Sequence, residues 1–210
     1  RSSIPSITVY RPSIIVGDSQ TGYTNTYHGF YAPYRITHLI ATKLPLHEMD
    51  LTPLLTALGL QGDERKNFIP VDWVSRAVVK IFDRPHSHGE TYHLSHPNPL
   101  PVSKLLDAGR EVFGAAHQPS EMPIEVSLEE LLPPFREQLS TYRENWIVPP
   151  VFARTQIDAA LPDDLPPPFD SSLANMLVRS SVADNFGWPP EKGTPADQRL
   201  KQLFRTNGFH

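Results

Sequence analysis

The chain has 210 residues, 39% of them hydrophobic and 20% charged, which suits a soluble globular protein of one domain plus a lobe. A formal charge of −4 and a pI near 6.1 argue against nucleic acid or an anionic membrane as main partner. Without cysteine, disulfides and thiolate zinc sites are excluded, and a cytoplasmic location is expected. No long apolar run and no charged-then-apolar leader occurs, so we expect neither a membrane span nor a signal peptide.

The stretch from residue 7 to residue 22 organises the rest of the chain. Residues 7–10 are β-branched or aromatic, residues 14–16 form a second apolar run, and Gly17 and small polar residues follow. This pattern predicts a buried strand that ends in a loop. In open α/β sheets, ligands bind beside the carboxyl ends of strands. The polar segment at 21–34 is therefore either a ligand-facing loop or an ordinary surface loop.

Strands and helices alternate through the next part of the chain. Apolar residues recur at helical spacing in some segments, while β-branched and aromatic residues dominate others. The predicted helices are 27–43, 51–59, 72–82 and 102–113, and the predicted strands are 67–71 and 91–94. Asp72 is expected to cap its helix, because its carboxylate can accept hydrogen bonds from free amides. Strand–helix alternation with short loops indicates an α/β fold.

The second half of the chain differs from the first in its proline content and in its mainly helical apolar pattern. Proline accounts for 23 of the 210 residues, and all adjacent proline pairs lie beyond residue 130. Apolar spacing predicts helices at 128–139, 155–161 and 171–186, with at most a short strand at 147–148. We expect a sheet-containing portion at 1–115, a helical substrate or lid lobe at 116–188, and a polar tail at 189–210.

Three motifs carry a family resemblance. They are RPSIIVGDSQTG at 11–22, NFIPVDWV at 67–74 and TYHLSHPNP at 91–99. In this order and spacing they resemble the extended short-chain dehydrogenases/reductases. The similarity is closest to the NAD(P)-dependent epimerase/dehydratase and male-sterility-like acyl-thioester reductase branches. It covers residues 4–115 well and residues 150–188 loosely.

Two motifs of that family are missing. The chain has no glycine-rich G-x-G-x-x-G turn for the dinucleotide and no Tyr-x-x-x-Lys pair for proton transfer. The resemblance therefore implies the C-terminal part of a Rossmann-like doubly wound sheet with a mainly helical substrate lobe. The complete protein would use NAD or NADP on a carbonyl, acyl-thioester or nucleotide-sugar substrate, together with an N-terminal half absent from this sequence. The first predicted core strand also lies so close to Arg1 that no earlier strand of this sequence could pair with it in a sheet. A homo-oligomer is a further expectation.

The resemblance also assigns roles to individual residues. None is catalytic, because the catalytic pair belongs to the missing half. The backbone of four residues would lie beside the nicotinamide: Pro12, Ser13, Ile14 and Ile15. Residues of the following loop would begin the substrate pocket: Asp18, Ser19, Thr21 and Gly22. Lys66 lies near the position where nucleotide-sugar enzymes of the family place a phosphate-binding arginine.

Two alternatives to an oxidoreductase remain open. Gly17-Asp18-Ser19 after an apolar strand also matches the nucleophile block of GDSL-type serine esterases, with Ser19 as nucleophile. The Asn-Asp block of those enzymes is absent, and the only D-x-x-H pair, Asp83 with His86, comes early in the chain. The second alternative is a non-enzymatic domain that binds a ligand or a partner. The nine histidines show no metal-binding spacing, and no metal site is expected.

Overall fold

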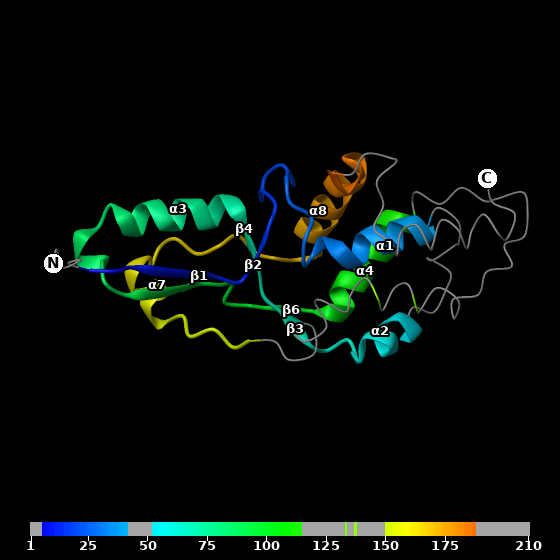
Figure 1. Ribbon diagram of the computed structural model, residues 1–210, viewed down its shortest axis with the longest axis horizontal. Coiled ribbons are helices and arrows are strands. Elements are labelled where there is room, and N and C mark those ends of the chain that lie inside the picture. The colour runs from blue at the N-terminus through cyan, green and yellow to red at the C-terminus, as the bar shows by residue number, and fades with distance from the viewer. Residues whose placement is uncertain (1–5, 42–51, 115–132, 134–136, 138–149, 188–210) are drawn as a thin grey trace, which may run out of the picture.

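The computed structural model describes residues 6–41, 52–114, 133, 137 and 150–187, and the fold is described for these residues. Short strands and helices alternate along the chain, which confirms the α/β class (Figure 1). The strands are β1 (Val9–Pro12), β2 (Ile14–Val16), β3 (Arg65–Lys66), β4 (Phe68–Pro70), β5 (Thr91–Leu94) and β6 (Leu100–Pro101). The α-helices are α1 (Tyr31–Ala41), α2 (Thr52–Leu58), α3 (Val71–Phe82), α4 (Val102–Gly114), α7 (Thr155–Ala160) and α8 (Ser171–Ala183). Two 3-10 turns are η1 (Pro85–Ser87) and η3 (Asn185–Gly187).

The opening strand is divided at Ser13 and changes its partner there. β1 pairs in parallel with β5, and β2 pairs in parallel with β4. Ser13 N donates to Leu94 O at 2.9 Å, and the next amide, Ile14 N, donates to Asn67 O at 3.3 Å. β3 and β6 form a separate antiparallel pair. Through β4, the carboxyl end of the opening strand lies directly beside the start of α3, because α3 begins where β4 ends.

One hydrophobic core lies between β5, α3 and α7. Trp73, Ala77 and Ile81 repeat every fourth residue of α3 and are fully buried, and Ala77 and Ile81 belong to the apolar stripe that the sequence predicts. They pack with Leu94 of β5 and Ile157 of α7. The indole Nε1 of Trp73 also donates to Asp164 O at 3.0 Å. This packing joins a late segment of the chain to its first strands.

A second, aromatic core lies under α1, α4 and α8. Phe30 is fully buried, and its ring centroid lies 5.1 Å from those of both Tyr34 and Phe68. In Figure 1, α1, α4 and α8 gather away from α3 and α7. Leu177 and Val178 bring α8 into this core, so the helix packs against α1 and α4. The expected division at residues 115 and 188 stays a prediction.

Several predicted boundaries differ from the structure. α1 begins at Tyr31 rather than at 27. α3 begins at Val71 with Pro70 as its N-cap, so the expectation that Asp72 caps the helix is wrong. α8 ends at Ala183, and the next turn contains Asn185 and Phe186 at φ 47° and 53°. The predicted strand at 147–148 and the tail at 189–210 lie outside the described residues, as does the helix at 128–139 apart from 133 and 137.

The opening strand is less buried than its sequence predicts. Ile15 is 43% exposed, and Ile7 just before β1 is 65% exposed. Among the described residues β1 has one strand neighbour, β5. Other exposed apolar side chains lie on α3, where Val79 and Phe82 are 56% and 69% exposed. None of the described helices is long and apolar enough to cross a membrane.

Candidate functional site

The loop at 17–22 is held in one conformation at the carboxyl end of β2. Gly17 N donates to the Tyr31 hydroxyl at 2.8 Å, and Asp18 N donates to Tyr23 O at 2.9 Å. A Cβ on Gly17 would lie 2.7 Å from Tyr23 O, so only glycine fits this close approach. Burial raises the pKa of Tyr31 to about 12, which keeps the phenol neutral. The strand end is thus fixed by α1.

The Asp18 side chain stabilises the turn by accepting hydrogen bonds from the residues that follow it. Its Oδ1 accepts from Gln20 N at 2.9 Å, from Thr21 N at 2.8 Å and from Thr21 Oγ1 at 2.9 Å. The amide of Gln20 and the groups of Thr21 stabilise the charged carboxylate and lower the pKa of Asp18. Gly22 N closes the turn on Asp18 O at 2.8 Å, and Gly22 adopts a φ of 73°. The predicted substrate residues of the loop therefore form one hydrogen-bonded unit.

Asp72 fastens this loop to α3. Its Oδ1 accepts from Ser19 N at 2.9 Å, and its Oδ2 accepts from Ser19 Oγ at 2.8 Å. Both carboxylate oxygens are therefore engaged with a residue 53 positions earlier in the chain. The expected N-cap role fails because Asp72 already lies within the helix, one residue after its start at Val71. We call this paired contact the Asp72–Ser19 clamp.

The hydrogen bond of Ser19 Oγ to Asp72 bears on whether Ser19 can act as an esterase nucleophile. A serine nucleophile needs a neighbouring general base, which in serine esterases is a histidine. Here Ser19 Oγ donates to a carboxylate, and Gln20 Nε2 lies 3.4 Å from it. Asp83 and His86, the other half of the esterase motif, lie at the far end of α3 and in η1. The geometry gives Ser19 a structural contact and does not favour the esterase alternative.

The four residues expected beside the nicotinamide lie where β1 passes into β2. Pro12 ends β1, Ser13 makes the switch of partner, and Ile14 and Ile15 begin β2. The Ser13 hydroxyl is buried and has no hydrogen-bond partner among the described residues. Ile15 has an exposed side chain on the same short segment. Their assignment to a cofactor remains a prediction.

Lys66 differs from the loop residues in its environment. It lies on β3, and its side chain is 2% exposed. Burial lowers the pKa of Lys66, while the charge of Glu64 acts in the opposite direction. The structure therefore places this lysine in the interior beside the β3–β6 pair. Its predicted contact with a substrate phosphate remains untested.

A cavity of about 590 Å³ lies beside the loop and was missed by the sequence analysis. Thr21 lines it on the loop side, and α8 contributes most of the remaining wall, including Asn175 and Arg179. A Cβ on Gly22 would lie 3.0 Å from Met176 O, so loop and helix touch at this edge. The available signal was the row of polar residues at helical spacing within 171–186. It could not be tied to the loop from sequence alone.

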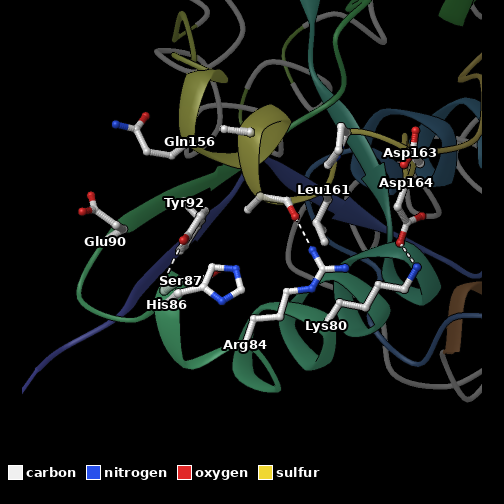
Figure 2. Close-up of a pocket in the computed structure, with 13 residues that line it drawn as sticks. Lys80, Arg84, His86, Ser87, Glu90, Tyr92, Gln156, Leu161, Asp163 and Asp164 are labelled. Carbon is white, nitrogen blue, oxygen red and sulfur yellow. Dashed lines mark hydrogen bonds and ion pairs between the residues drawn. The ribbon is translucent and has the colours of Figure 1, made fainter.

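A second cavity, of about 560 Å³, lies at the amino end of β5 (Figure 2). Lys80 of α3 pairs with Asp164 at 2.6 Å, and Arg84 donates to Ala160 O at the end of α7. Although burial acts to raise it, the pKa of Asp164 is lowered by the Lys80 hydrogen bond and the nearby cations. These contacts tie α7 to α3. Because ligands of α/β sheets bind at the opposite strand ends, we assign this cavity a structural role.

The histidines near β5 make separate contacts. His93 Nδ1 lies 3.2 Å from Ala153 O, and His96 Nε2 lies 3.2 Å from Pro167 O. Burial lowers the pKa of His96. Within the described ranges no three His, Cys, Asp or Glu side chains come together as a metal-binding group. Both rings instead join the strand region to the segment at 150–170.

Comparison with known families and proteins adds to this geometry. Residues 1–78 match the male sterility protein family, an NAD-binding family. Two aldehyde reductases of Aspergillus flavus, lnbA and lnaA, are 32% and 31% identical over 110 and 119 residues. The non-canonical nonribosomal peptide synthetase FrzA of a Cladobotryum species is 36% identical over 91 residues. These matches cover 52%, 56% and 43% of this chain but only 9%, 10% and 7% of those proteins.

A solved structure shares the fold. The terminal R domain from the myxalamid PKS-NRPS biosynthetic pathway superposes with a TM-score of 0.60 at 23% identity. The match covers 85% of this chain and 44% of that chain. This chain therefore corresponds to less than half of the solved domain and to about a tenth of the curated relatives.

Proposed function

Because this chain is a member of the male-sterility-like reductases within the short-chain dehydrogenase/reductase family, we propose that it is the C-terminal, substrate-binding half of an NAD(P)-dependent reductase. Its substrate is an aldehyde or an acyl thioester, and hydride transfer requires an upstream half that carries the glycine-rich turn and the Tyr-x-x-x-Lys pair. Residues 1–115 complete the dinucleotide-binding sheet, and residues 116–188 contribute the substrate lobe.

The observation that carries this proposal is the rigid loop at the carboxyl end of β2. Gly17 and Ser19 are anchored through Tyr31 and Asp72, at the sheet edge where α/β enzymes bind ligands. A loop held from two helices loses little conformational freedom on binding, which favours precise positioning of a substrate. The sequence contains no Tyr-x-x-x-Lys pair, so the loop supports binding and orientation rather than proton transfer.

The exposed apolar edge of the opening strand supports the need for an upstream half. Ile7, just before β1, and Ile15 of β2 are exposed although both belong to apolar runs of the sequence, and β1 has one strand neighbour among the described residues. Parallel sheets of this class are buried on both faces. An upstream segment that adds strands here would cover these side chains. The dinucleotide bound by that upstream half would then contact the backbone of residues 12–15.

The relatives favour reduction over epimerisation. Two of them are described as aldehyde reductases and one as a nonribosomal peptide synthetase, and the solved neighbour is a terminal R domain. The acyl-thioester reductases that the three sequence motifs resemble act on an activated acyl group, which favours a thioester substrate. A nucleotide-sugar substrate has no comparable support, since Lys66, its proposed phosphate contact, is buried.

The proposal is tested with the full-length protein that contains this chain. Purified protein is incubated with NADH or NADPH and an acyl thioester or an aldehyde, and oxidation of the nicotinamide is followed by absorbance. We expect turnover that depends on the thioester or aldehyde, and no turnover by residues 1–210 alone.

Two variants complete this test. Asp72→Ala should raise KM, because the loop is released. Asp83→Ala serves as the matched control, because Asp83 lies at the other end of α3 and its side chain is exposed. If the full-length protein oxidises neither nicotinamide with either substrate class, the reductase function is wrong. Turnover by residues 1–210 alone would instead refute the requirement for an upstream half.

A further inference from the structure

The C-terminal end of α8 carries two features that local sequence rules disfavour, and both contact Tyr27. We propose that Tyr27 and Asp184 position the 17–22 loop for the acyl substrate, so that both are positioning residues of the reduction. We call their contact the Tyr27–Asp184 latch. This inference rests on the proposed reductase function and adds two residues to it. It is carried by one hydrogen bond, by the turn after α8, and by the contacts that lead from Tyr27 to Gly17.

The first feature is an acidic residue at the end of the helix. Asp184 is the C-cap of α8, where the negative end of the helix dipole disfavours a carboxylate. Its Oδ2 accepts a hydrogen bond from the Tyr27 hydroxyl at 2.5 Å, across 157 positions of the chain. The same hydroxyl lies 3.3 Å from Thr24 O, but it has one proton, and the shorter contact to a charged oxygen receives it. Burial and the bond to Asp184 raise the pKa of Tyr27, so the phenol keeps this proton.

The second feature is a left-handed turn that follows the helix. Asn185 and Phe186 adopt φ values of 47° and 53°, which are unfavourable for residues with a side chain. Phe186 is nevertheless 1% exposed, and its ring centroid lies 6.0 Å from that of Tyr27. A Cβ on Gly187 would lie 2.6 Å from Cε2 of Tyr27, so the backbone of the turn lies against the ring. Where local preferences are broken together in this way, a functional contact is the expected reason.

Tyr27 connects this turn to the candidate site. Its ring meets the ring of Tyr31 edge to face, with centroids 5.4 Å apart and planes at 74°. The Tyr31 hydroxyl accepts the hydrogen bond of Gly17 N at 2.8 Å, at the carboxyl end of β2. A movement of Tyr27 therefore changes the surroundings of the side chain that holds Gly17.

The 17–22 loop also lies on α8. A Cβ on Gly22 would lie 3.0 Å from both Met176 O and Ser180 Cβ, so the loop backbone touches the helix one turn before Asp184. The Asp72–Ser19 clamp holds the loop from α3, and the latch holds the segment that follows the loop on α8. Loss of the latch leaves the clamp in place and removes the second of these two supports.

The test measures KM for the acyl thioester or aldehyde and for the nicotinamide in the full-length protein. Tyr27→Phe keeps the ring and removes the hydroxyl, and Asp184→Ala removes the acceptor without weakening α8, because the carboxylate opposes the helix dipole. Each should raise the substrate KM by about 3- to 10-fold, the effect of one hydrogen bond, and leave the nicotinamide KM unchanged. The double variant should be no worse than either single variant, because both changes remove the same bond. Asp184→Asn keeps an oxygen acceptor and should restore the substrate KM.

Tyr34→Phe is the matched control. The Tyr34 hydroxyl donates to Leu105 O at 2.8 Å inside the aromatic core, so the same chemical change removes a hydrogen bond outside the latch. This variant should melt at a lower temperature and keep both KM values. A rise of the substrate KM in Tyr34→Phe equal to that in Tyr27→Phe would mean that general destabilisation explains the effect, and it overturns the latch. Failure of Asp184→Asn to restore KM overturns it as well.

Two binding and exchange measurements separate this inference from the proposed function. A thioether analogue of the substrate cannot be reduced, and calorimetry gives its Kd for each variant. Hydrogen exchange of the amides at 17–27 should be faster in Tyr27→Phe and Asp184→Ala, but not in Tyr34→Phe or Asp184→Asn. Weaker analogue binding and faster exchange in the two latch variants, without any turnover, support the latch and overturn the reductase.

The opposite combination overturns the latch alone. Turnover with the same substrate KM in Tyr27→Phe and Asp184→Ala as in the unchanged protein leaves the reductase intact and removes the positioning role, whether or not exchange is faster. If Tyr27→Phe does not fold, Asp184→Ala makes the same comparison, because Asp184 is exposed and outside the core.

Discussion

The Asp72–Ser19 clamp makes a prediction whose size follows from its geometry. Asp72→Ala removes the acceptor of Ser19 N at 2.9 Å and of Ser19 Oγ at 2.8 Å. A hydrogen bond to a charged group contributes about 1.5–3 kcal/mol, and less where water can replace the lost acceptor. Because both contacts are only partly buried, we expect a loss of about 2 kcal/mol in the free energy of unfolding.

Urea denaturation and thermal melting measure this loss. For a chain of this size, about 2 kcal/mol corresponds to a fall of roughly 4–8 °C in Tm. Ser19→Ala removes only the hydroxyl contact and should cost about 1 kcal/mol. In a double-mutant cycle the two changes should be coupled by about 1 kcal/mol, because they remove one shared hydrogen bond.

Asp83→Ala is the matched control for this cycle. Asp83 lies at the C-cap of the same helix, where a carboxylate faces the negative end of the helix dipole. Its removal should change stability by no more than about 0.5 kcal/mol. If Asp72→Ala costs no more than Asp83→Ala, or if the cycle shows no coupling with Ser19, the clamp does not hold the loop as described.

Three further outcomes are expected. Tyr31→Phe should lower the free energy of unfolding by about 1–2 kcal/mol, because Gly17 N loses its buried acceptor; equal melting temperatures would contradict this. Burial lowers the pKa of both His38 and His96, so the unfolded state binds more protons below about pH 6.5; stability should fall as the pH drops through that range, and a flat profile in urea titrations would refute it. Residues 1–210 alone should bind a hydrophobic dye and self-associate in size-exclusion chromatography through Ile15 and Phe82, and Phe82→Lys should reduce both; a monomer without dye binding would argue against a missing partner.

Local sequence patterns predict much of this fold. The apolar stripe of α3 and the strand at 91–94 depend on side chains within a few residues of one another, and both elements occur in the structure within one residue of their predicted bounds. Gly17 and Asp18 likewise signal a loop after a strand, because a glycine and a short carboxylate favour turns. These signals are short-range, and a single sequence records them directly.

The candidate site depends on contacts that no local pattern records. Asp72 has the composition of a helix cap, yet it lies inside α3 and binds a loop 53 residues earlier. The lysine at position 66 has the composition of a surface charge, yet its side chain is buried on β3. In both cases the chain packing around the residue, rather than its neighbours in sequence, determines what it contacts.

By itself, the sequence determined that this chain carries a strand ending in a polar loop, followed by helices that cover it, because those features follow from periodicity and turn chemistry. Only the tertiary structure decided that α8 returns to line a cavity with Thr21, and that Asp72 holds Ser19. Segments more than 50 residues apart meet because two separate cores bury their apolar faces. Burial of the apolar faces also brings the polar residues on the opposite faces together at one site. The hydrophobic effect joins segments that are far apart in sequence, so the spacing of residues along the chain does not predict these contacts.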